Sequence, residues 1–562
     1  MNKAVKQPNI EYAVAIIHFL LTFWFERILF HFDGDRDLFV SAARTETISD
    51  TAEYVLVYGL SKLCAALIIW LLWKLLFAMI YRRISRETMI VFAGIYVLGG
   101  IIGLILFPDT IGIEIDNYTN YGYAVRFLPT YWHSVFTGAL YGGCLMVIPH
   151  PISIFLFQWM AFNAVMAWIW SHTRFQVFVL LLYFLPESFQ IIFNPYRNNY
   201  YTILCMFYVS YLLVASSQRE RNARMVEVGG ISALTAFLMV WRSEGVLIGA
   251  GGLIFLLLFI WKRKLKWIAA GLLLCGCVFV CLSSVQRIGM KKYYGQDYMF
   301  INTMGPLHSI LNNPQADLSY DGAAEDLAAI GDIVPVEVIK QYALTGYRDY
   351  NYTSGRADFN QTLAKEDTAR QYMSAYYRII FHNIGDYLDV QTNYFFTSLQ
   401  VNCAHTTYSY SQESYIELDH FVYDSWFQGY EDLRRAAWTA QWERNEVRKF
   451  LNIVLSRLMT IWRELWMAAS LNVLIHVGTI VASILIMCME FIHAVIQKDR
   501  SHWGWLILFA TVFGEMCAIA LFMPEGRAPY LYPVLYADYV LLFFYMQRNL
   551  SHTEKRQGQA LS

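Results

Sequence analysis

Long, uninterrupted apolar stretches constrain the fold of this chain more than any other feature. A transmembrane helix needs about 20 apolar residues, because its backbone polar groups must be satisfied within the segment itself. The chain is 57% hydrophobic and 15% charged, which excludes an ordinary soluble globular protein. We therefore predict an all-α polytopic membrane protein. About 12 transmembrane helices are expected, at 11–30, 54–80, 88–107, 151–170, 175–193, 200–216, 228–242, 245–261, 266–284, 466–488, 503–523 and 528–547.

The placement of basic residues predicts the topology. Lys and Arg cluster at 79–86, 216–224, 261–266, 496–500 and 547–556. Cytoplasmic loops carry an excess of these residues, so we place all of these clusters and both chain ends inside. The apolar run 134–148 would reverse this arrangement if it crossed the membrane. We predict that it forms a short re-entrant or interfacial helix, covered at its ends by protein or by a water-filled cavity.

The polar stretches divide the chain into three predicted domains. Residues 1–284 form an N-terminal transmembrane domain that contains an outer loop at 108–133. Residues 285–465 are acidic and aromatic, and they form a mostly helical extracytoplasmic domain that closes with an amphipathic interface helix at 451–465. Residues 466–562 contribute the C-terminal transmembrane helices.

Several classes of function lack support in the sequence. A net charge of −1 gives no reason to expect nucleic acid as a partner. Phosphate-binding glycine loops, zinc-protease motifs and serine-hydrolase motifs are absent from the sequence. Eight of the nine cysteines lie in or beside apolar runs, so no disulfide framework or cysteine-based zinc site is indicated. We expect no cofactor.

Acidic residues gather in the first large outer loop. Asp116 follows a helix exit among tyrosines, with Glu114 beside it and His133 shortly after. A partly desolvated carboxylate at the membrane interface could deprotonate a hydroxyl group, and Glu114 or Asp109 could share that task. The alternative is that these residues only cap and solvate a loop. A divalent ion bound by the three carboxylates stays open, although no metal motif indicates one.

Arginines recur in other segments predicted to lie on the outer side. Arg242 and Glu244 fall between two apolar runs, where an unpaired charge is costly, so they form either a structural ion pair or a ligand contact. Arg527 and Tyr530 precede the last membrane helix, and the planar guanidinium of arginine suits a phosphate. The tyrosine could instead belong to an interfacial aromatic belt. Arg197 lies in another outer loop, before an apolar helix, and a solvated loop residue is the favoured interpretation.

The order of these features resembles the GT-C superfamily of membrane glycosyltransferases, which use polyprenyl-phosphate sugars. The resemblance rests on EIDNYTNYGYA, PTYWH, WRSEGVLIGAGGLIFLLLF and EGRAPYLYPVLYADYVLLFF, and it covers about two thirds of the chain in layout. It implies that Asp116 is the loop acid, His133 the histidine beside it, and Arg527 with Tyr530 the segment that contacts the lipid phosphate.

The chain also departs from the family pattern. Ser134 stands where the family has a proline after the histidine, which puts the role of His133 in doubt. Two extra helices precede the loop, so Asp33, Asp35 or Asp37 is a rival base.

The resemblance implies inverting transfer of a sugar from a polyprenyl-phosphate donor to an extracytoplasmic glycan, lipid or protein. Arg527, Tyr530, Arg242 and Arg197 would then bind the donor phosphate. Two alternatives are a flippase or transporter of a lipid-linked glycan, and a polymerase or ligase that uses a lipid-diphosphate oligosaccharide. We expect a bacterial plasma membrane, with the site on the extracytoplasmic face. A glycan on the sequon at Asn117 would block the site, which favours a host that does not glycosylate such sequons.

Overall fold

The computed structural model consists almost entirely of helices in the part of the chain that it describes. It describes residues 10–29, 48–81, 84–107, 115–124, 127, 129, 134–193, 197–217, 225–242, 244–261, 265–293, 297–341, 366–399, 445–523, 526 and 528–560. These residues contain no β-strand, which confirms the predicted all-α class for the described part of the chain. The chain forms two compact units. The first holds Met1–Gln218, Thr406–Ala469 and Tyr539–Ser562, and the second holds Arg219–His405 and Ser470–Asp538.

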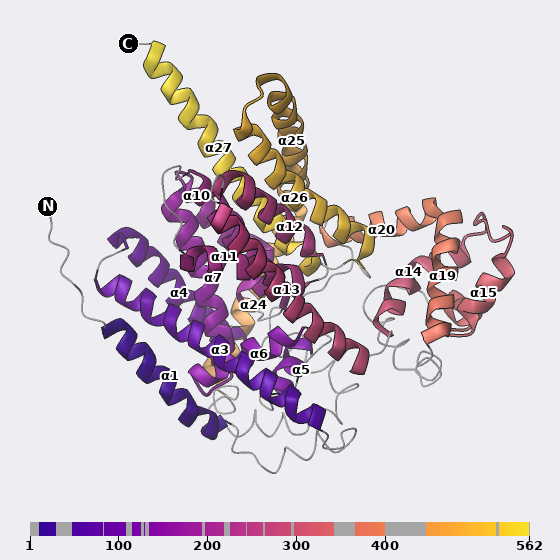
Figure 1. Cartoon of the computed structure of the whole chain (residues 1–562), viewed down its shortest axis with the longest axis horizontal. Helices are drawn as coiled ribbons and strands as arrows, with labels where there is room; N and C mark the ends of the chain where they lie inside the picture. Colours follow the sequence, from indigo (N-terminus) through magenta and orange to yellow (C-terminus); the bar gives the residue numbers. More distant parts are fainter. Residues whose placement is uncertain are drawn as a thin grey trace. The chain divides into compact units, whose positions relative to one another are not determined.

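The first unit consists largely of the N-terminal helices (Figure 1). They are α1 (Ile10–Leu29), α3 (Ile48–Ile80), α4 (Arg86–Leu106), α5 (Ile115–Ala124), α6 (Val135–Val147), α7 (Ile152–His172), α8 (Gln176–Leu181), the 3₁₀ turn η2 (Leu182–Phe184), α9 (Pro186–Phe193) and α10 (Arg197–Ser217). The later helix α24 (Glu446–Ala468) and the C-terminal part of α27 (Tyr532–Ala560) complete it.

The short helix α6 lies inside the first unit. It packs against α1, α3, α5 and α7, and all of its side chains except Leu140 are buried. Two glycines permit the close approach to α3: a Cβ atom on Gly142 would lie 2.5 Å from Ser61 Oγ, and one on Gly143 would lie 2.6 Å from Cys64 Cβ. Small residues at such contacts let membrane helices pack closely. The run 134–148 therefore forms a short helix that is covered by protein. Its predicted re-entrant or interfacial position stays a prediction.

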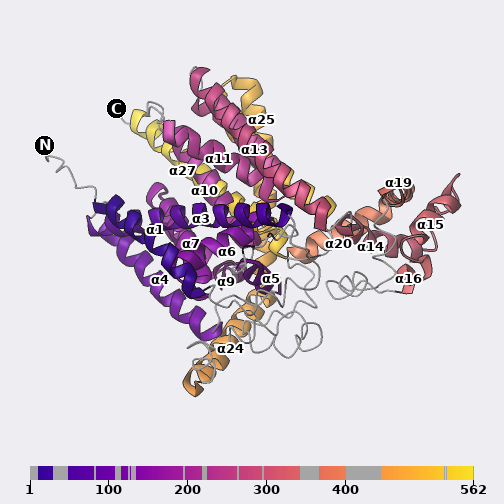
Figure 2. The ribbon, with the colours of Figure 1, turned by 60° about the horizontal axis from the view of Figure 1, so that its bottom comes forward.

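Helix α24 crosses the end of α4 (Figure 2). Arg448 donates from Nη1 to the carbonyl of Ile105 over 2.9 Å, and Asn452 donates to the carbonyls of Ile105 and Leu106 over 3.1 and 3.2 Å. The last carbonyls of a helix lack partners within it and carry partial negative charge, so a cation and an amide stabilise this end of α4. The amphipathic helix that we predicted at 451–465 begins earlier, at Glu446. Side chains in its N-terminal half cap the C-terminal end of α4.

The second unit combines membrane-type helices with a small helical subdomain. Its elements are α11 (Met225–Trp241), α12 (Val246–Phe255), the π-turn η3 (Leu256–Ile260), α13 (Leu265–Tyr293), α14 (Asp297–Asn312), α15 (Ala323–Gly331), α16 (Val336–Gln341), α19 (Glu366–His382), α20 (Ile384–Ser398), the π-turn η4 (Val473–Val477), α25 (Gly478–Gln497), α26 (Arg500–Phe522), the 3₁₀ turn η5 (Ala528–Tyr530) and the start of α27.

Glycines bring α12 close to two neighbouring helices. A Cβ atom on Gly249 would lie 2.1 Å from Met239 Cγ in α11, and one on Gly251 would lie 1.9 Å from Thr511 Oγ1 in α26. Helix α12 therefore packs against both α11 and α26.

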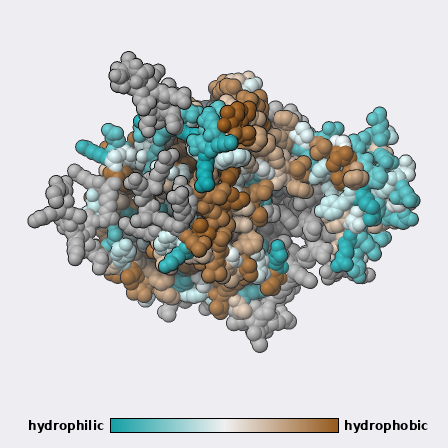
Figure 3. Space-filling model, turned by 45° about the horizontal axis from the view of Figure 1, so that its top comes forward, coloured by the Kyte–Doolittle hydropathy of each residue, from teal (hydrophilic) through white to brown (hydrophobic). Residues whose placement is uncertain are grey.

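The subdomain of α14, α15, α16 and α19 has its own apolar core. Leu307, Ile310, Ile330, Tyr372 and Ile379 are fully buried in it. Figure 3 shows mainly hydrophilic surface on this part, at the right of the view, and brown apolar patches elsewhere. The subdomain falls within residues 285–465, and the predicted division of the chain at 284 and 465 stays a prediction.

Seven helices in the described residues are long and apolar enough to cross a membrane. They correspond to the expected spans near 54–80, 88–107, 151–170, 200–216, 266–284, 466–488 and 503–523, with the sixth beginning later, at Val473. The chain is therefore a multi-pass membrane protein.

The remaining five of the predicted 12 spans stay unconfirmed. Three give shorter apolar helices, at Ile10–Phe25, Met225–Trp241 and Val246–Ile260, and 528–547 is not among the candidates. Residues 175–193 are bent by 71° before Pro186, since a residue preceding proline avoids the helical conformation.

Candidate functional site

The break between α11 and α12 concentrates charge at the end of an apolar hairpin. Helix α11 ends at Trp241, and the N–H of Gly245 bonds to the carbonyl of Arg242 over 3.1 Å to close a tight turn. Helix α12 then begins at Val246. The turn brings Arg242 and Glu244 together, so that Arg242 Nε donates to Glu244 Oε1 over 2.6 Å and Nη2 donates to the same oxygen.

Arg242 is more deeply buried than its partner Glu244. Its side chain is 6% exposed, against 18% for Glu244. The guanidinium carbon lies 5.6 Å from the centre of the Tyr530 ring, which comes from the turn η5 just before α27. A guanidinium within about 6 Å of an aromatic ring is attracted by the ring's electron density. The structure thus joins two residues that the sequence proposed separately as phosphate ligands, Arg242 and Tyr530.

Glu515 supplies a second carboxylate at the start of α12. It is fully buried in α26, and its Oε2 accepts the backbone N–H of Ile248 over 3.0 Å. The first N–H groups of a helix lack intrahelical acceptors and carry partial positive charge, so this carboxylate anchors the first turn of α12 to α26. We name Arg242, Glu244, Glu515 and Tyr530 the hinge cluster.

The predicted base lies in a helix rather than in a loop. Asp116 is the second residue of α5, within the stretch 108–133 that we predicted as an outer loop. The structure describes its backbone but not its side chain. Around it, Asn117 and Asn120 are fully buried, and Tyr141 Oη lies 3.5 Å from Asn117 Oδ1.

The burial of Asn117 removes one argument made from the sequence. A glycan is bulky and requires an exposed asparagine. The sequon at Asn117 is therefore closed to glycosylation in this fold, and it gives no information about the host.

Arg197 is placed differently from the expectation of a solvated loop. It is the first residue of α10 and is half-buried, and the two asparagines that follow it are each 1% exposed. Arg197 belongs to the first unit, whereas the hinge cluster belongs to the second. The predicted residues Glu114, His133 and Arg527 lie outside the described residues, as do Asp109 and the rival acids Asp33, Asp35 and Asp37.

Sequence reasoning missed several buried charged side chains, among them Glu515, Arg448 and Asp538. Glu515 and Arg448 are described above, and Asp538 in α27 accepts the hydroxyl of Ser483 in α25, whose Oγ lies 2.7 and 2.8 Å from its two carboxylate oxygens. Each is an ionisable residue inside or beside an apolar run, a signal that is visible in the sequence. The sequence does not reveal the partner of such a residue, because Glu515, for example, bonds to a residue 267 positions away.

Comparison with protein-family models, with curated proteins and with solved structures returns no match to this chain. The resemblance to GT-C glycosyltransferases therefore rests on the short sequence motifs, and the function is argued from the residues themselves.

Proposed function

We propose that the protein is a membrane glycosyltransferase that moves a sugar from a polyprenyl-phosphate donor to an extracytoplasmic acceptor. The observation that supports this function best is the buried Arg242 in the hinge cluster, held between Glu244 and the ring of Tyr530. Such a group suits the phosphate of a lipid that reaches a protein from the bilayer. The donor's apolar tail remains among lipid and apolar helices, while its sugar-phosphate head meets the arginine.

We propose that Arg242 exchanges its carboxylate partner, Glu244, for the phosphate of the donor. Glu244 Oε1 accepts hydrogen bonds from both Nε and Nη2 of the guanidinium. A phosphate presents two oxygens to the same edge and can form the bidentate arrangement that arginine favours. In this proposal the donor phosphate displaces Glu244, and Tyr530 supports the guanidinium from the ring face.

The leaving group explains why a fixed arginine helps the reaction. When the bond between the sugar and the phosphate breaks, negative charge grows on the phosphate oxygen. A guanidinium already held in a water-poor place stabilises this charge without reorganisation, an effect of about 100- to 1,000-fold in rate for one donor group. Arg527 and Arg197 are proposed to contribute to the same binding, on their sequence positions alone.

Asp116 is the proposed base for the acceptor hydroxyl. Its backbone lies in the first turn of α5, where the helix dipole favours a negative charge. The carboxylate would accept the proton as the acceptor oxygen attacks the anomeric carbon from the face opposite the phosphate, which inverts the configuration. Glu114 and His133 are proposed to assist it. A bacterial plasma membrane remains the proposed location.

The first experiment is sugar transfer by the purified protein from a panel of labelled polyprenyl-phosphate sugars. We compare the wild type with Asp116→Asn and Arg242→Lys. We expect turnover of one donor, with turnover lost in Asp116→Asn while donor binding persists. Binding without turnover in the wild type, across donors and plausible acceptors, would replace the enzyme by a flippase. Full activity in Asp116→Asn would assign the base to Asp33, Asp35 or Asp37.

A further inference from the structure

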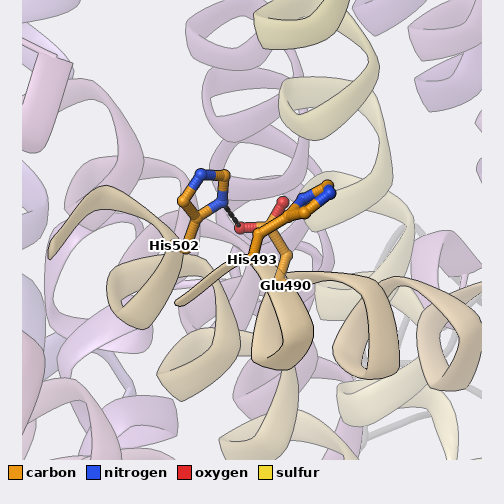
Figure 4. A group of neighbouring side chains, drawn as sticks. All are labelled: Glu490, His493 and His502. Carbon is orange, nitrogen blue, oxygen red and sulfur yellow. Dashed lines mark hydrogen bonds and ion pairs between the residues drawn. The ribbon is translucent and has the colours of Figure 1, made fainter. Parts of the chain in front are cut away.

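One end of the α25–α26 hairpin carries a group of metal-binding side chains that the proposed function does not use. Glu490 and His493 lie three residues apart on α25, and therefore on one face of the helix. His502 lies in the first turn of α26 and reaches toward them (Figure 4).

The turn between the helices is built so that His502 meets α25. Lys498 ends α25 in the left-handed conformation, with φ 54°, which reverses the chain within two residues. Asp499 then caps α26, because its Oδ1 accepts the N–H of Ser501 over 3.0 Å and its Oδ2 accepts the Ser501 hydroxyl over 2.7 Å. Two fixed helix ends thus define the position of His502.

The three side chains already lie at nearly the spacing of metal ligands. One donor atom from each residue lies within 4.8 Å of the others. His502 Nδ1 and Glu490 Oε2 are 2.8 Å apart, and the rings of His493 and His502 are centred 5.2 Å apart at 57°. Side-chain rotations that adjust these spacings would place the three donor atoms around a tetrahedral zinc ion, whose ligands lie at about 2.0–2.1 Å.

The burial of the three residues suits a bound cation. Glu490 is 2% exposed, His502 is partly buried and His493 is exposed. A carboxylate at the end of an apolar helix loses its hydration, and a divalent cation would compensate for that loss. The exposed imidazole of His493 leaves a path by which an ion can enter.

We propose that Glu490, His493 and His502 bind a divalent transition-metal ion of the zinc type and so join α25 to α26. Two imidazoles and one carboxylate match the ligand set of sites that keep a fourth position for water. Nitrogen ligands favour zinc and its transition-metal neighbours over magnesium or calcium. His502 lies 13 residues before Glu515 on α26, which is about 20 Å along the helix axis. The site is therefore separate from the hinge cluster and does not depend on the proposed sugar transfer.

The test is metal binding by the full-length protein in lipid nanodiscs, stripped with a chelator and titrated with Co²⁺ and Zn²⁺. We compare the wild type with Glu490→Gln, His493→Ala and, as a matched control, Ile492→Ala. Ile492 is an exposed neighbour on α25 that offers no ligand. His493→Ala keeps the bond between Glu490 and His502, so its fold is expected to survive.

We expect one ion per chain, a tetrahedral cobalt spectrum without a thiolate charge-transfer band, and a thermal midpoint that zinc raises. Affinity should fall at least about tenfold in Glu490→Gln and His493→Ala, since even the loss of an outer hydrogen-bond partner costs that much at metal sites. Ile492→Ala should bind as the wild type does.

Three results would overturn the proposal. Unchanged binding in His493→Ala, or no binding in the wild type, would leave the group as a hydrogen-bonded helix contact. A thiolate band would assign the ion to cysteines, such as the exposed Cys277 and Cys281 on α13.

Discussion

Two arginine–carboxylate pairs in the second unit are built in opposite ways. At the hinge, the guanidinium of Arg242 is 6% exposed and Glu244 is 18% exposed. In the small subdomain, Asp326 is the buried partner at 1% exposed, while Arg378 is 56% exposed. The subdomain therefore buries the anion of its pair, and the hinge buries the cation of its pair.

The partners of the buried group reveal what each pair does. Asp326 accepts Arg378 Nε over 3.0 and 2.9 Å and the hydroxyl of Tyr320 over 2.8 Å, so both of its oxygens are used within the subdomain. Glu244 Oε1 accepts both Nε and Nη2 of Arg242. In the proposed function the hinge pair opens to admit a phosphate, whereas the Asp326–Arg378 pair stabilises the subdomain. The comparison therefore sets a proposed binding pair against a structural one.

The largest effect should come from Arg242→Lys. We expect sugar transfer to fall about 100-fold, because lysine keeps the charge but cannot offer the bidentate edge. Turnover and donor binding are measured on protein whose thermal midpoint matches the wild type. Arg378→Lys is the matched control and should transfer sugar at the wild-type rate. Equal losses in both variants would erase the distinction between the pairs.

Asp326→Asn should act on stability alone. The variant weakens charge-assisted hydrogen bonds to a buried group, and we expect a cost of about 2 kcal/mol, reduced from a fully buried pair by the exposure of Arg378. Hydrogen exchange of α15 and α19 in the full-length protein measures it, with the exposed Asp321→Asn as the control. A change in the KM for donor would show that this pair takes part in binding.

Gly251→Ala tests whether packing sets the position of the hinge. The added Cβ would lie 1.9 Å from Thr511 Oγ1, so α12 or α26 must shift. We expect a loss of about 1–2 kcal/mol in unfolding free energy together with weaker donor binding. Gly276→Ala in α13 meets no atom within 4 Å and should be neutral or slightly stabilising. Unchanged donor binding in Gly251→Ala would mean that the hinge tolerates movement of α12.

The smallest effect near neutral pH is the titration of Asp326. The Arg378 guanidinium holds the pKa of this carboxyl below its ordinary value of 3.8. Because the folded state has the lower pKa, the stabilisation is complete above about pH 5 and is lost as the pH falls through the ordinary and then the folded value.

Exchange protection of α15 and α19, corrected for the intrinsic rate, should therefore decline in acid. Asp326→Asn should show a shallower decline. An identical decline in the variant would assign the acid sensitivity to another carboxyl.

Local patterns were enough to predict the helices and much of the hinge. Apolar length identified the segments of all seven long spans. The position between two apolar runs predicted that Arg242 and Glu244 form either an ion pair or a ligand contact, and the structure pairs them. The expected spans at 228–242, 245–261 and 175–193 stay unconfirmed, because the helices there are short or bend before a proline. The sequence prediction also placed Asp116 in a loop, because the ten residues of α5 are mostly polar or tyrosine and lack the apolar pattern by which the other helices were found.

The sequence by itself determined that this chain is a helical membrane protein with charges at the ends of its apolar runs, because the cost of burying charge and backbone in lipid acts on each segment separately. Tertiary structure alone decided which charges meet. Tyr530 reaches Arg242, Glu515 reaches the start of α12, and His502 reaches Glu490. The first two contacts join residues more than 250 positions apart, and the third depends on the geometry of one turn. Such pairings arise from helix packing, which no local pattern records.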